Sequence, residues 1–247
     1  MKAMIFAAGL GTRLRPITNN MPKALVEVGH VPLLEIAIRR LKHFGCEAII
    51  INIHHFGEQV LEFLENKNNF GIPIEISDER DLLLDTGGGL KKAAWFLKDA
   101  PFLVYNADII TDLNLHLFYQ SHLQNKALAT LAVRDRPSSR HLLFNQENVL
   151  CGWVHNKTGA RKICRADKNT RALAFSGLHV LSPEIFEWMP EKPVFSIIDV
   201  YLEAGKTQDV VAFPHDESIW LDVGKIPALK KAVSLIQELD IDLNDDN

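Results

Sequence analysis

A Gly-rich stretch near the N-terminus has the features of a phosphate-binding loop. Residues 7–16 read Ala-Ala-Gly-Leu-Gly-Thr-Arg-Leu-Arg-Pro, and Pro22-Lys23 follows shortly afterwards. Glycines and small side chains let backbone N–H groups approach phosphate oxygens closely. Arg13 adds a fork-shaped cation and Lys23 a point charge, which together would stabilise the charge on a departing diphosphate. The residues expected to contact phosphates are Ala8, Gly9, Gly11, Thr12, Arg13 and Lys23.

Two other structures could account for the same stretch. One is a tight turn after a strand, with Arg13 and Lys23 as ordinary surface cations. The other is a dinucleotide-binding loop, because Gly9-Leu10-Gly11 begins like that fingerprint. Leu14, however, stands where the third glycine of the fingerprint belongs, and no Gly-Lys-Ser/Thr sequence is present either. The two cations and the downstream Pro-Lys therefore favour phosphate binding.

Two aspartates far apart in the sequence each follow a strand-like run. Asp108 comes after Phe-Leu-Val-Tyr-Asn-Ala at 102–107, and Asp222 lies in Trp-Leu-Asp-Val-Gly at 220–224. Either one alone is more simply explained as a helix cap or a turn residue. Together they could bind one Mg²⁺, which favours one or two carboxylates plus substrate phosphates.

Two further segments are candidates for contacts with the organic parts of substrates. Gly87 and Gly88, in Asp-Thr-Gly-Gly-Gly at 85–89, open a helical pattern and could leave a flat surface for a base, or form a flexible turn. Ser176 and Gly177 lie in a strand-like run, where a glycine marks either the close approach of a ligand or a bulge. We expect Ser176, Gly177 and Asn106 to contact a second substrate, distinct from the one whose phosphates the Gly-rich loop binds.

The elements that must position these residues alternate in the first half of the chain. This alternation implies a mostly parallel sheet flanked by helices, an α/β fold in which ligands bind beyond the carboxyl ends of the strands. The Gly-rich loop and Asp108 both fall at such ends. Strands are predicted at 1–7, 48–53, 74–77, 101–106 and 128–133, and helices at 33–44, 56–66, 88–98 and 115–124.

The pattern changes after residue 133. Short strand-like pieces at 141–144, 149–154 and 173–181 predict a small antiparallel annex. We expect one domain over 1–247, with halves at 1–133 and 134–247. The remaining predictions are helices near 183–188, 196–205 and 225–239, strands at 210–213 and 219–221, and a frayed end at 240–247.

The composition limits the classes of function. The chain has 247 residues, 47% of them hydrophobic, and a net charge of −4, which gives no reason to expect a nucleic-acid partner. Its three cysteines fit neither a zinc site nor a disulfide framework, so reduced thiols are expected. No apolar run has the length of a signal peptide or of a membrane span. We expect a cytoplasmic protein without a membrane partner, and the oligomeric state stays open.

These motifs, in their order and spacing, resemble the sugar-phosphate nucleotidyltransferase family over nearly the whole chain. Residues 7–16 look like its Gly-rich signature, Pro22-Lys23 like its catalytic lysine segment, and 85–89 like its base-contact segment. Asp108 and Asp222 fall where the two metal-binding aspartates occur. The resemblance implies a nucleotide-diphospho-sugar transferase fold with nucleotide-binding and sugar-binding halves. It also implies catalytic Arg13 and Lys23, a Mg²⁺ cofactor, and attack of a sugar 1-phosphate on a nucleoside triphosphate with release of pyrophosphate.

Within the family, the likeness is strongest to members that use UTP and N-acetylmuramate 1-phosphate in cell-wall recycling. Mannose- and heptose-1-phosphate guanylyltransferases are the alternative. Ala107 replaces a glycine that usually precedes the first metal aspartate, Lys225 replaces a commoner threonine, and residues 165–170 stand in for a missing Glu-Lys sugar-binding pair. From other classes, a nucleotide-binding regulator without catalysis and a nicotinamide-dependent oxidoreductase are the rivals. The retained cations and aspartates argue against the first, and Leu14 argues against the second.

Overall fold

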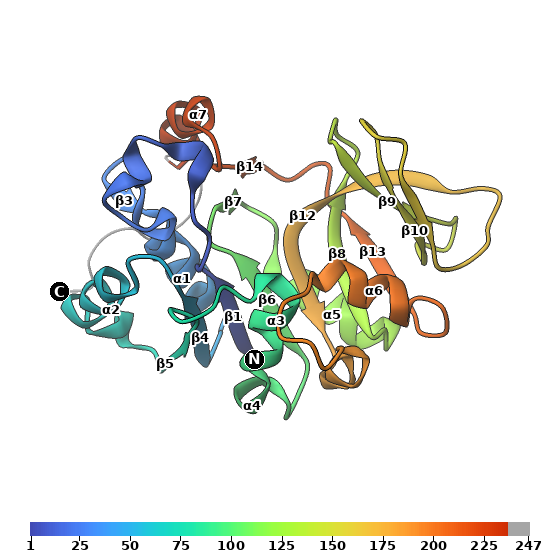
Figure 1. The fold of residues 1–247 in the computed structure, drawn as a ribbon, viewed down its shortest axis with the longest axis horizontal. Coiled ribbons are helices and arrows are strands. Elements are labelled where there is room, and N and C mark those ends of the chain that lie inside the picture. Colours follow the sequence, from blue (N-terminus) through green and yellow to red (C-terminus); the bar gives the residue numbers. More distant parts are fainter. Residues whose placement is uncertain (237–247) are drawn as a thin grey trace. The chain divides into compact units, whose positions relative to one another are not determined.

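The computed structural model describes residues 1–236 and contains two compact units that interleave along the chain (Figure 1). The first comprises Met1–Leu83, Tyr105–Leu115 and the chain from Ser218 onward, and the second comprises Leu84–Val104 and His116–Glu217. The expected boundary at 133/134 therefore coincides with neither unit. Strand β6 (Phe102–Asn106) runs from the second unit into the first.

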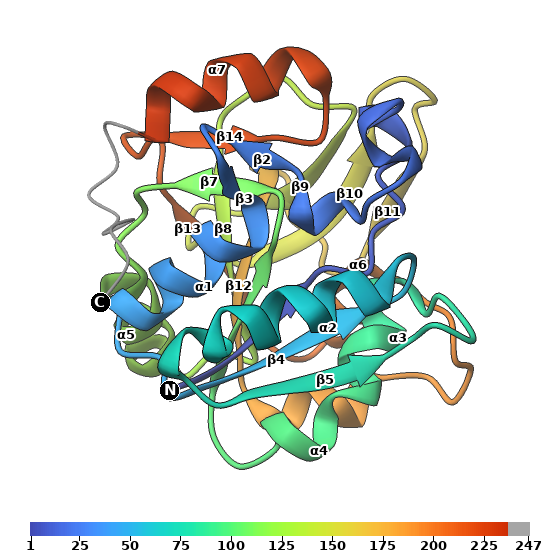
Figure 2. The same ribbon diagram turned by 90° about the vertical axis from the view of Figure 1, so that its left-hand side faces the viewer.

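The first unit is built on the parallel strands β1 (Lys2–Phe6), β4 (Ala48–Ile53) and β5 (Ile74–Asp78) (Figure 2). The apolar runs form strands because their side chains are buried, as parallel sheets require: the three central residues of β1 and all but the first of β4 are buried. At the carboxyl ends, Phe6 lies opposite Asn52, and Asn52 lies opposite Ser77. The connecting helices are α1 (Leu33–His43) and α2 (Gly57–Asn66), and η4 (Asn68–Gly71) leads into β5.

A separate apolar cluster in the first unit joins residues 14–36 to the segment 223–232. It brings the short strands β7 (Ile109–Thr111) and β14 (Trp220–Asp222), which pair antiparallel, together with α7 (Ile226–Ile236). The hairpin of β2 (Glu27–Val28) and β3 (Val31–Pro32) and the turns η1 (Thr12–Leu14), η2 (Ile17–Asn19) and η3 (Lys23–Leu25) complete this part. The buried residues of the cluster are Leu14, Val26, Val28, Leu33, Ile36, Ile110, Val223, Leu229 and Ala232.

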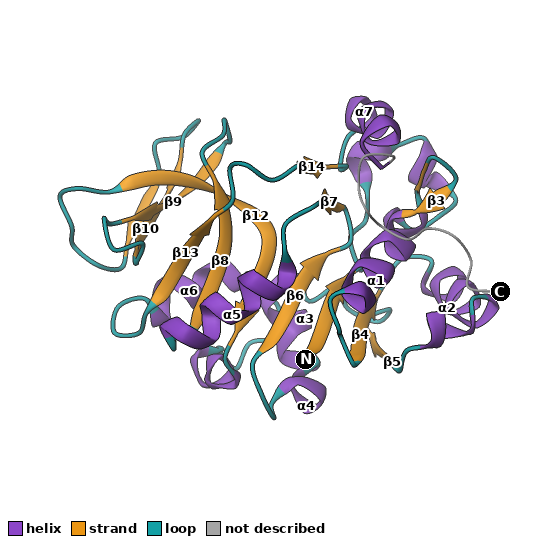
Figure 3. Ribbon diagram, turned by 180° about the vertical axis from the view of Figure 1, so that it is seen from behind, coloured by secondary structure: helices purple, strands orange, loops and turns teal. Residues whose placement is uncertain are grey.

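The second unit contains the predicted antiparallel annex (Figure 3). Its strands are β8 (Ala129–Arg134), β9 (Arg140–Phe144), β10 (Leu150–His155), β11 (Arg161–Ile163), β12 (Arg171–Leu181) and β13 (Val210–Pro214). All pair antiparallel except β13, which runs parallel to β8. The helices are α3 (Asp85–Lys92), α4 (Ala94–Leu97), α5 (Leu115–Asn125), η5 (Pro183–Trp188) and α6 (Ile197–Ala204).

The structure confirms the α/β class and most predicted elements, with three differences. The helix predicted at 88–98 begins earlier, at Asp85, and breaks at Ala93, where the backbone leaves helical geometry. The helix predicted at 183–188 is a 3₁₀ helix. The strands β2, β3, β7 and β11 were not predicted, because two or three residues are too short to show a period. The predictions for 237–239 and for 240–247 lie outside the described residues.

None of the described helices combines the length and the hydropathy that crossing a bilayer requires.

Candidate active site

Four of the predicted site residues gather in the first unit, around Gly224. A Cβ atom built on Gly224 would lie 2.7 Å from Asp222 Oδ1, 2.9 Å from Arg13 Nη2 and 3.4 Å from Lys23 Nζ. Lys23 Nζ in turn forms an ion pair with Asp108 Oδ2. The missing side chain of Gly224 thus leaves the space in which charged atoms from opposite ends of the chain meet.

The backbone around the two aspartates explains how they come together. Strands β7 and β14 pair with Asp222 opposite Ile109, and the N–H of Val223 donates to the carbonyl of Asp108 at 2.9 Å. The N–H of Gly224 donates to Asp222 Oδ1 at 2.8 Å, which fixes that carboxylate. The hydroxyl of Tyr105 donates to the carbonyl of Ile109 at 3.0 Å and closes the turn that carries Asp108.

The Gly-rich loop places Arg13 beside Lys23. Gly11 has a φ of 63°, in the left-handed region that favours glycine, and a Cβ there would lie 2.9 Å from Thr18 Cγ2 and 3.0 Å from Lys23 Cβ. The Thr18 hydroxyl donates to the carbonyl of Gly11 at 2.8 Å. Gly11 is therefore required by the conformation and close packing of the loop itself, in addition to the phosphate approach that was predicted for it.

The start of the loop differs from the expectation. The N–H groups of Ala7 and Ala8 donate to Asn52 Oδ1, at 2.7 and 3.3 Å. The amide of Ala8, predicted to face phosphate, therefore already has a partner within the protein. Asn52 was not predicted as a site residue. The sequence does single it out, because it is the one polar residue in the apolar run of β4.

Gly87 and Gly88 lie in the second unit and are covered. Both of their N–H groups donate to the carbonyl of Phe195, at 2.9 and 3.3 Å. A Cβ on Gly87 would overlap the ring of Phe195, and one on Gly88 would overlap the carbonyl oxygen of Pro193. The glycines thus let α3 pack closely on the segment 193–195, and the open flat surface on which the base contact was predicted is occupied by that segment.

Ser176 and Gly177, also in the second unit, lie in a bulge of β12. The register against β8 shifts between Phe175 and His179, and Gly177 has a φ of 83°. Ser176 is fully buried, and its hydroxyl forms a 2.8 Å hydrogen bond with His215 Nε2. Ser176 has no accessible surface, so in this position it cannot make the direct sugar contact that was expected. It can act only through its neighbours.

The remaining second-substrate candidate, Asn106, ends β6 in the first unit and is half-buried. Each group of candidates is thus assembled within its own unit. The cations and aspartates belong to the first, and Gly87, Gly88, Ser176 and Gly177 belong to the second.

The donor atoms at Gly224 fit a hard divalent cation that is bound together with phosphates. Asp108 and Asp222 supply carboxylate oxygens, the ligands that Mg²⁺ prefers, and one or two such groups per ion are usual when substrate phosphates complete the shell. Within residues 1–236, no cluster of three or more His, Cys, Asp or Glu side chains forms a complete metal cage. Asp108 also forms the partly accessible ion pair with Lys23.

Comparison with known proteins shows the family of this chain. Residues 2–144 match the family model described as "Nucleotidyl transferase". The chain belongs to the nucleotidyl transferase family. This nucleotidyltransferase is 32% identical to the N-acetylmuramate alpha-1-phosphate uridylyltransferase of Neisseria meningitidis serogroup B, over 95% of this chain and 98% of that protein.

A second relative and a solved structure extend the comparison. The mannose-1-phosphate guanyltransferase of Yarrowia lipolytica is 29% identical over 91% of this chain, which spans 61% of that protein. The structure of UDP-glucose pyrophosphorylase from Acinetobacter baumannii superposes with a TM-score of 0.77 at 19% identity, covering 97% of this chain and 95% of that one. The latter supports the fold. The names of these relatives are those of sugar-phosphate uridylyl- and guanylyltransferases, so this nucleotidyltransferase does not belong with the nicotinamide-dependent oxidoreductases.

Proposed function

We propose that this nucleotidyltransferase joins UTP to an N-acetylated sugar 1-phosphate, such as N-acetylmuramate 1-phosphate, and releases pyrophosphate in a Mg²⁺-dependent reaction. The observation that carries the proposal is the gathering of Arg13 Nη2, Lys23 Nζ and Asp222 Oδ1 around Gly224, with Asp108 held by Lys23. The choice of UTP and of this sugar is supported by the likeness to the Neisseria uridylyltransferase, which extends over almost the full length of both chains.

The proposed reaction is a single displacement. A phosphate oxygen of the sugar 1-phosphate attacks the α-phosphorus of UTP, a new P–O bond forms, and the α–β phosphoanhydride bond breaks. The bonding electrons leave with pyrophosphate. No proton transfer is required, because the attacking phosphate is already ionised near neutral pH. The task of the protein is therefore to position two anions and to stabilise the charge of the leaving group.

Arg13 and Lys23 would bind the triphosphate. The planar guanidinium of Arg13 can hold two phosphate oxygens, while the ammonium of Lys23 acts as a point charge. Asp108 and Asp222 would hold Mg²⁺, which when bound offsets the repulsion between the two phosphates. Gly9, Gly11 and Thr12 would contact the phosphates through their backbone, and Asn106 and Gly177 stay candidates for contacts with the sugar. Gly87 and Gly88, which the segment 193–195 covers, would affect the base only through that segment.

Ala107 does not argue for a regulator that has lost catalysis. Its N–H donates to the carbonyl of Phe6 at 3.2 Å, and its φ is not positive, so an alanine fits the backbone at this position. A nucleoside triphosphate substrate would place the activity in the cytoplasm, and the proposed product would place it in cell-wall sugar recycling.

The test is a substrate panel. Pyrophosphate release is measured with UTP, GTP and dTTP, each with N-acetylmuramate, N-acetylglucosamine, glucose and mannose 1-phosphates, with and without Mg²⁺. The fastest turnover is expected with UTP and an N-acetylated sugar, and loss of turnover is expected when Mg²⁺ is chelated. Turnover with GTP alone would assign the protein to the guanylyltransferases, which the Yarrowia likeness keeps open. No turnover with any pair would refute the proposal.

A further inference from the structure

One buried amide links the start of the Gly-rich loop to the central strands. Asn52 is 3% exposed and is the only polar residue of β4. Its Oδ1 accepts hydrogen bonds from the N–H groups of Ala7 and Ala8, the two residues that follow β1 and precede Gly9. A polar side chain in this position would be costly without partners, because a buried amide that forms no hydrogen bonds destabilises the folded state. The contact with the loop therefore accounts for the asparagine.

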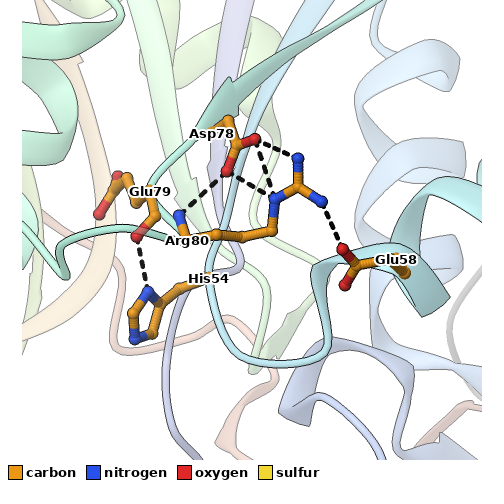
Figure 4. Close-up of polar contacts among 5 residues, drawn as sticks. All are labelled: His54, Glu58, Asp78, Glu79 and Arg80. Carbon is orange, nitrogen blue, oxygen red and sulfur yellow. Dashed lines mark hydrogen bonds and ion pairs between the residues drawn. The ribbon is translucent and has the colours of Figure 1, made fainter.

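The other side of the amide is fixed by a buried acid. Asn52 Nδ2 donates to Glu79 Oε1 at 2.8 Å, and Glu79 is only 1% exposed. The backbone of Glu79 is held on both sides, since its N–H donates to the carbonyl of Ile53 at 2.8 Å and its carbonyl lies 2.6 Å from His54 Nδ1. Figure 4 shows the His54 ring directed at this carbonyl, which can only accept, so Nδ1 carries the proton.

We propose that Asn52 is a positioning residue for the phosphate-binding loop and that Glu79 sets the orientation of its amide, an inference that rests on the proposed function of that loop. Ala7 and Ala8 have no side-chain donor or acceptor of their own. Asn52 therefore determines where the loop leaves the sheet, and with it the path of Gly9 and the placement of Arg13. It does so without touching the substrate.

Asn52 presents an acceptor to the loop and a donor to Glu79. The two backbone N–H groups need an acceptor, and the carboxylate of Glu79 needs a donor, so the residue between them must present both. An aspartate at position 52 would accept from the loop but would face Glu79 with a like charge. A glutamine at position 79 would remove that charge and offer a donor in its place. The polar roles of the two positions can thus be exchanged.

The experiment is a double-mutant cycle of Asn52→Asp and Glu79→Gln, assayed with UTP and the sugar 1-phosphate that turns over. Asn52→Asp is expected to raise the KM for UTP by about 10- to 100-fold, the equivalent of one lost buried hydrogen bond. The KM for the sugar phosphate should change much less. Glu79→Gln alone should have a small effect, because its amide oxygen can still accept from Asn52. The double variant should recover UTP affinity to within about threefold of the wild type.

A pH profile separates positioning from general damage. In Asn52→Asp the two facing carboxylates favour uptake of a shared proton, so its defect in UTP affinity should shrink as the pH falls from about 8 to about 6. The double variant should lack this dependence. Should Asn52→Asp not fold, Asn52→Ala replaces it, and the same selective rise in the KM for UTP is expected.

Ser77→Ala is the matched control. Ser77 lies opposite Asn52 on β5, is equally buried, and has a hydroxyl without a hydrogen-bond partner within residues 1–236. Its removal should leave the KM for UTP unchanged. A double variant no better than Asn52→Asp, or an unchanged KM in both position-52 variants, would overturn the inference. Failure of the proposed function would look different, because the wild type itself would then show no turnover with UTP, or Arg13→Ala and Asp108→Asn would retain it.

Discussion

Gly224→Ala should reduce catalysis while leaving the fold intact. The added Cβ would lie 2.7 Å from Asp222 Oδ1 and 2.9 Å from Arg13 Nη2. A carbon atom in contact with oxygen normally stays about 3.3–3.6 Å away, so both charged atoms would have to retreat by roughly half an ångström or more. The added Cβ would also lie 3.4 Å from Lys23 Nζ, so the ammonium group could no longer move toward Gly224.

The expected magnitude follows from this displacement. A misplacement of about 1 Å in a positioned group can lower a rate about 100-fold, so kcat/KM should fall roughly 10- to 100-fold, a loss of about 1.4–2.7 kcal/mol in the transition state. Stability should change by less than about 1 kcal/mol, because the φ of Gly224 is not positive and an alanine there restricts the unfolded chain. The loss of activity would therefore not be a loss of folded protein.

The assay combines steady-state pyrophosphate release with urea unfolding. Gly159→Ala is the converse control, because Gly159 has a φ of 71° and nothing lies within 4 Å of the added Cβ. That variant should lose about 1–2 kcal/mol of stability through the left-handed backbone and retain its activity. If Gly224→Ala kept kcat/KM within about twofold of the wild type, the convergence of charges at this glycine would have no catalytic meaning.

Three further predictions test other parts of the structure. Asp108→Asn should abolish turnover but retain much UTP binding, measured by thermal stabilisation, and a variant with wild-type turnover would remove Asp108 from the proposed metal site. Gly88→Ala should destabilise the protein by about 1–3 kcal/mol in urea, because its Cβ would overlap the segment 193–195, whereas an unchanged midpoint would mean that this segment yields freely. Burial lowers the pKa of His122 and His215 to about 4 and that of His179 to about 3, so the unfolded chain takes up these protons first as the pH falls below about 6.5. Stability should therefore decrease between pH 6.5 and 4, by up to about 1.4 kcal/mol per pH unit for each histidine, and a flat profile would contradict their burial as neutral rings.

The strands and helices of the first half were predictable because each carries its own pattern. The apolar run of β4 and the helical spacing of α1 are local properties, and both elements appear within one residue of the predicted bounds. The identities of the candidate phosphate-binding residues were equally local, since Arg13 and Lys23 stand out by type and spacing. Asn52 was overlooked for the same reason, because its role depends on partners more than twenty residues away on either side.

The roles of the glycines could not be predicted from the sequence. Gly87 and Gly88 suggested an open surface for a base, yet a distant segment of the second unit packs against them. Ser176 suggested a sugar contact, yet its hydroxyl is buried against His215. Gly224 had no assigned role, although its missing side chain makes room for the charged cluster. A glycine records only that space or a special backbone angle is needed, and the sequence does not say which neighbour needs it.

The class of fold, the Gly-rich loop with its cations and the two aspartates as candidate metal ligands could all be predicted from local patterns in the sequence. Tertiary structure alone decided that Asp108 and Asp222 meet through the pairing of β7 with β14, and that Lys23 holds Asp108 beside Gly224. These outcomes differ because the interactions act over different distances along the chain. Hydrophobic periodicity and turn preferences act over a few residues, whereas the charged cluster forms only when packing brings together residues 85 or more positions apart.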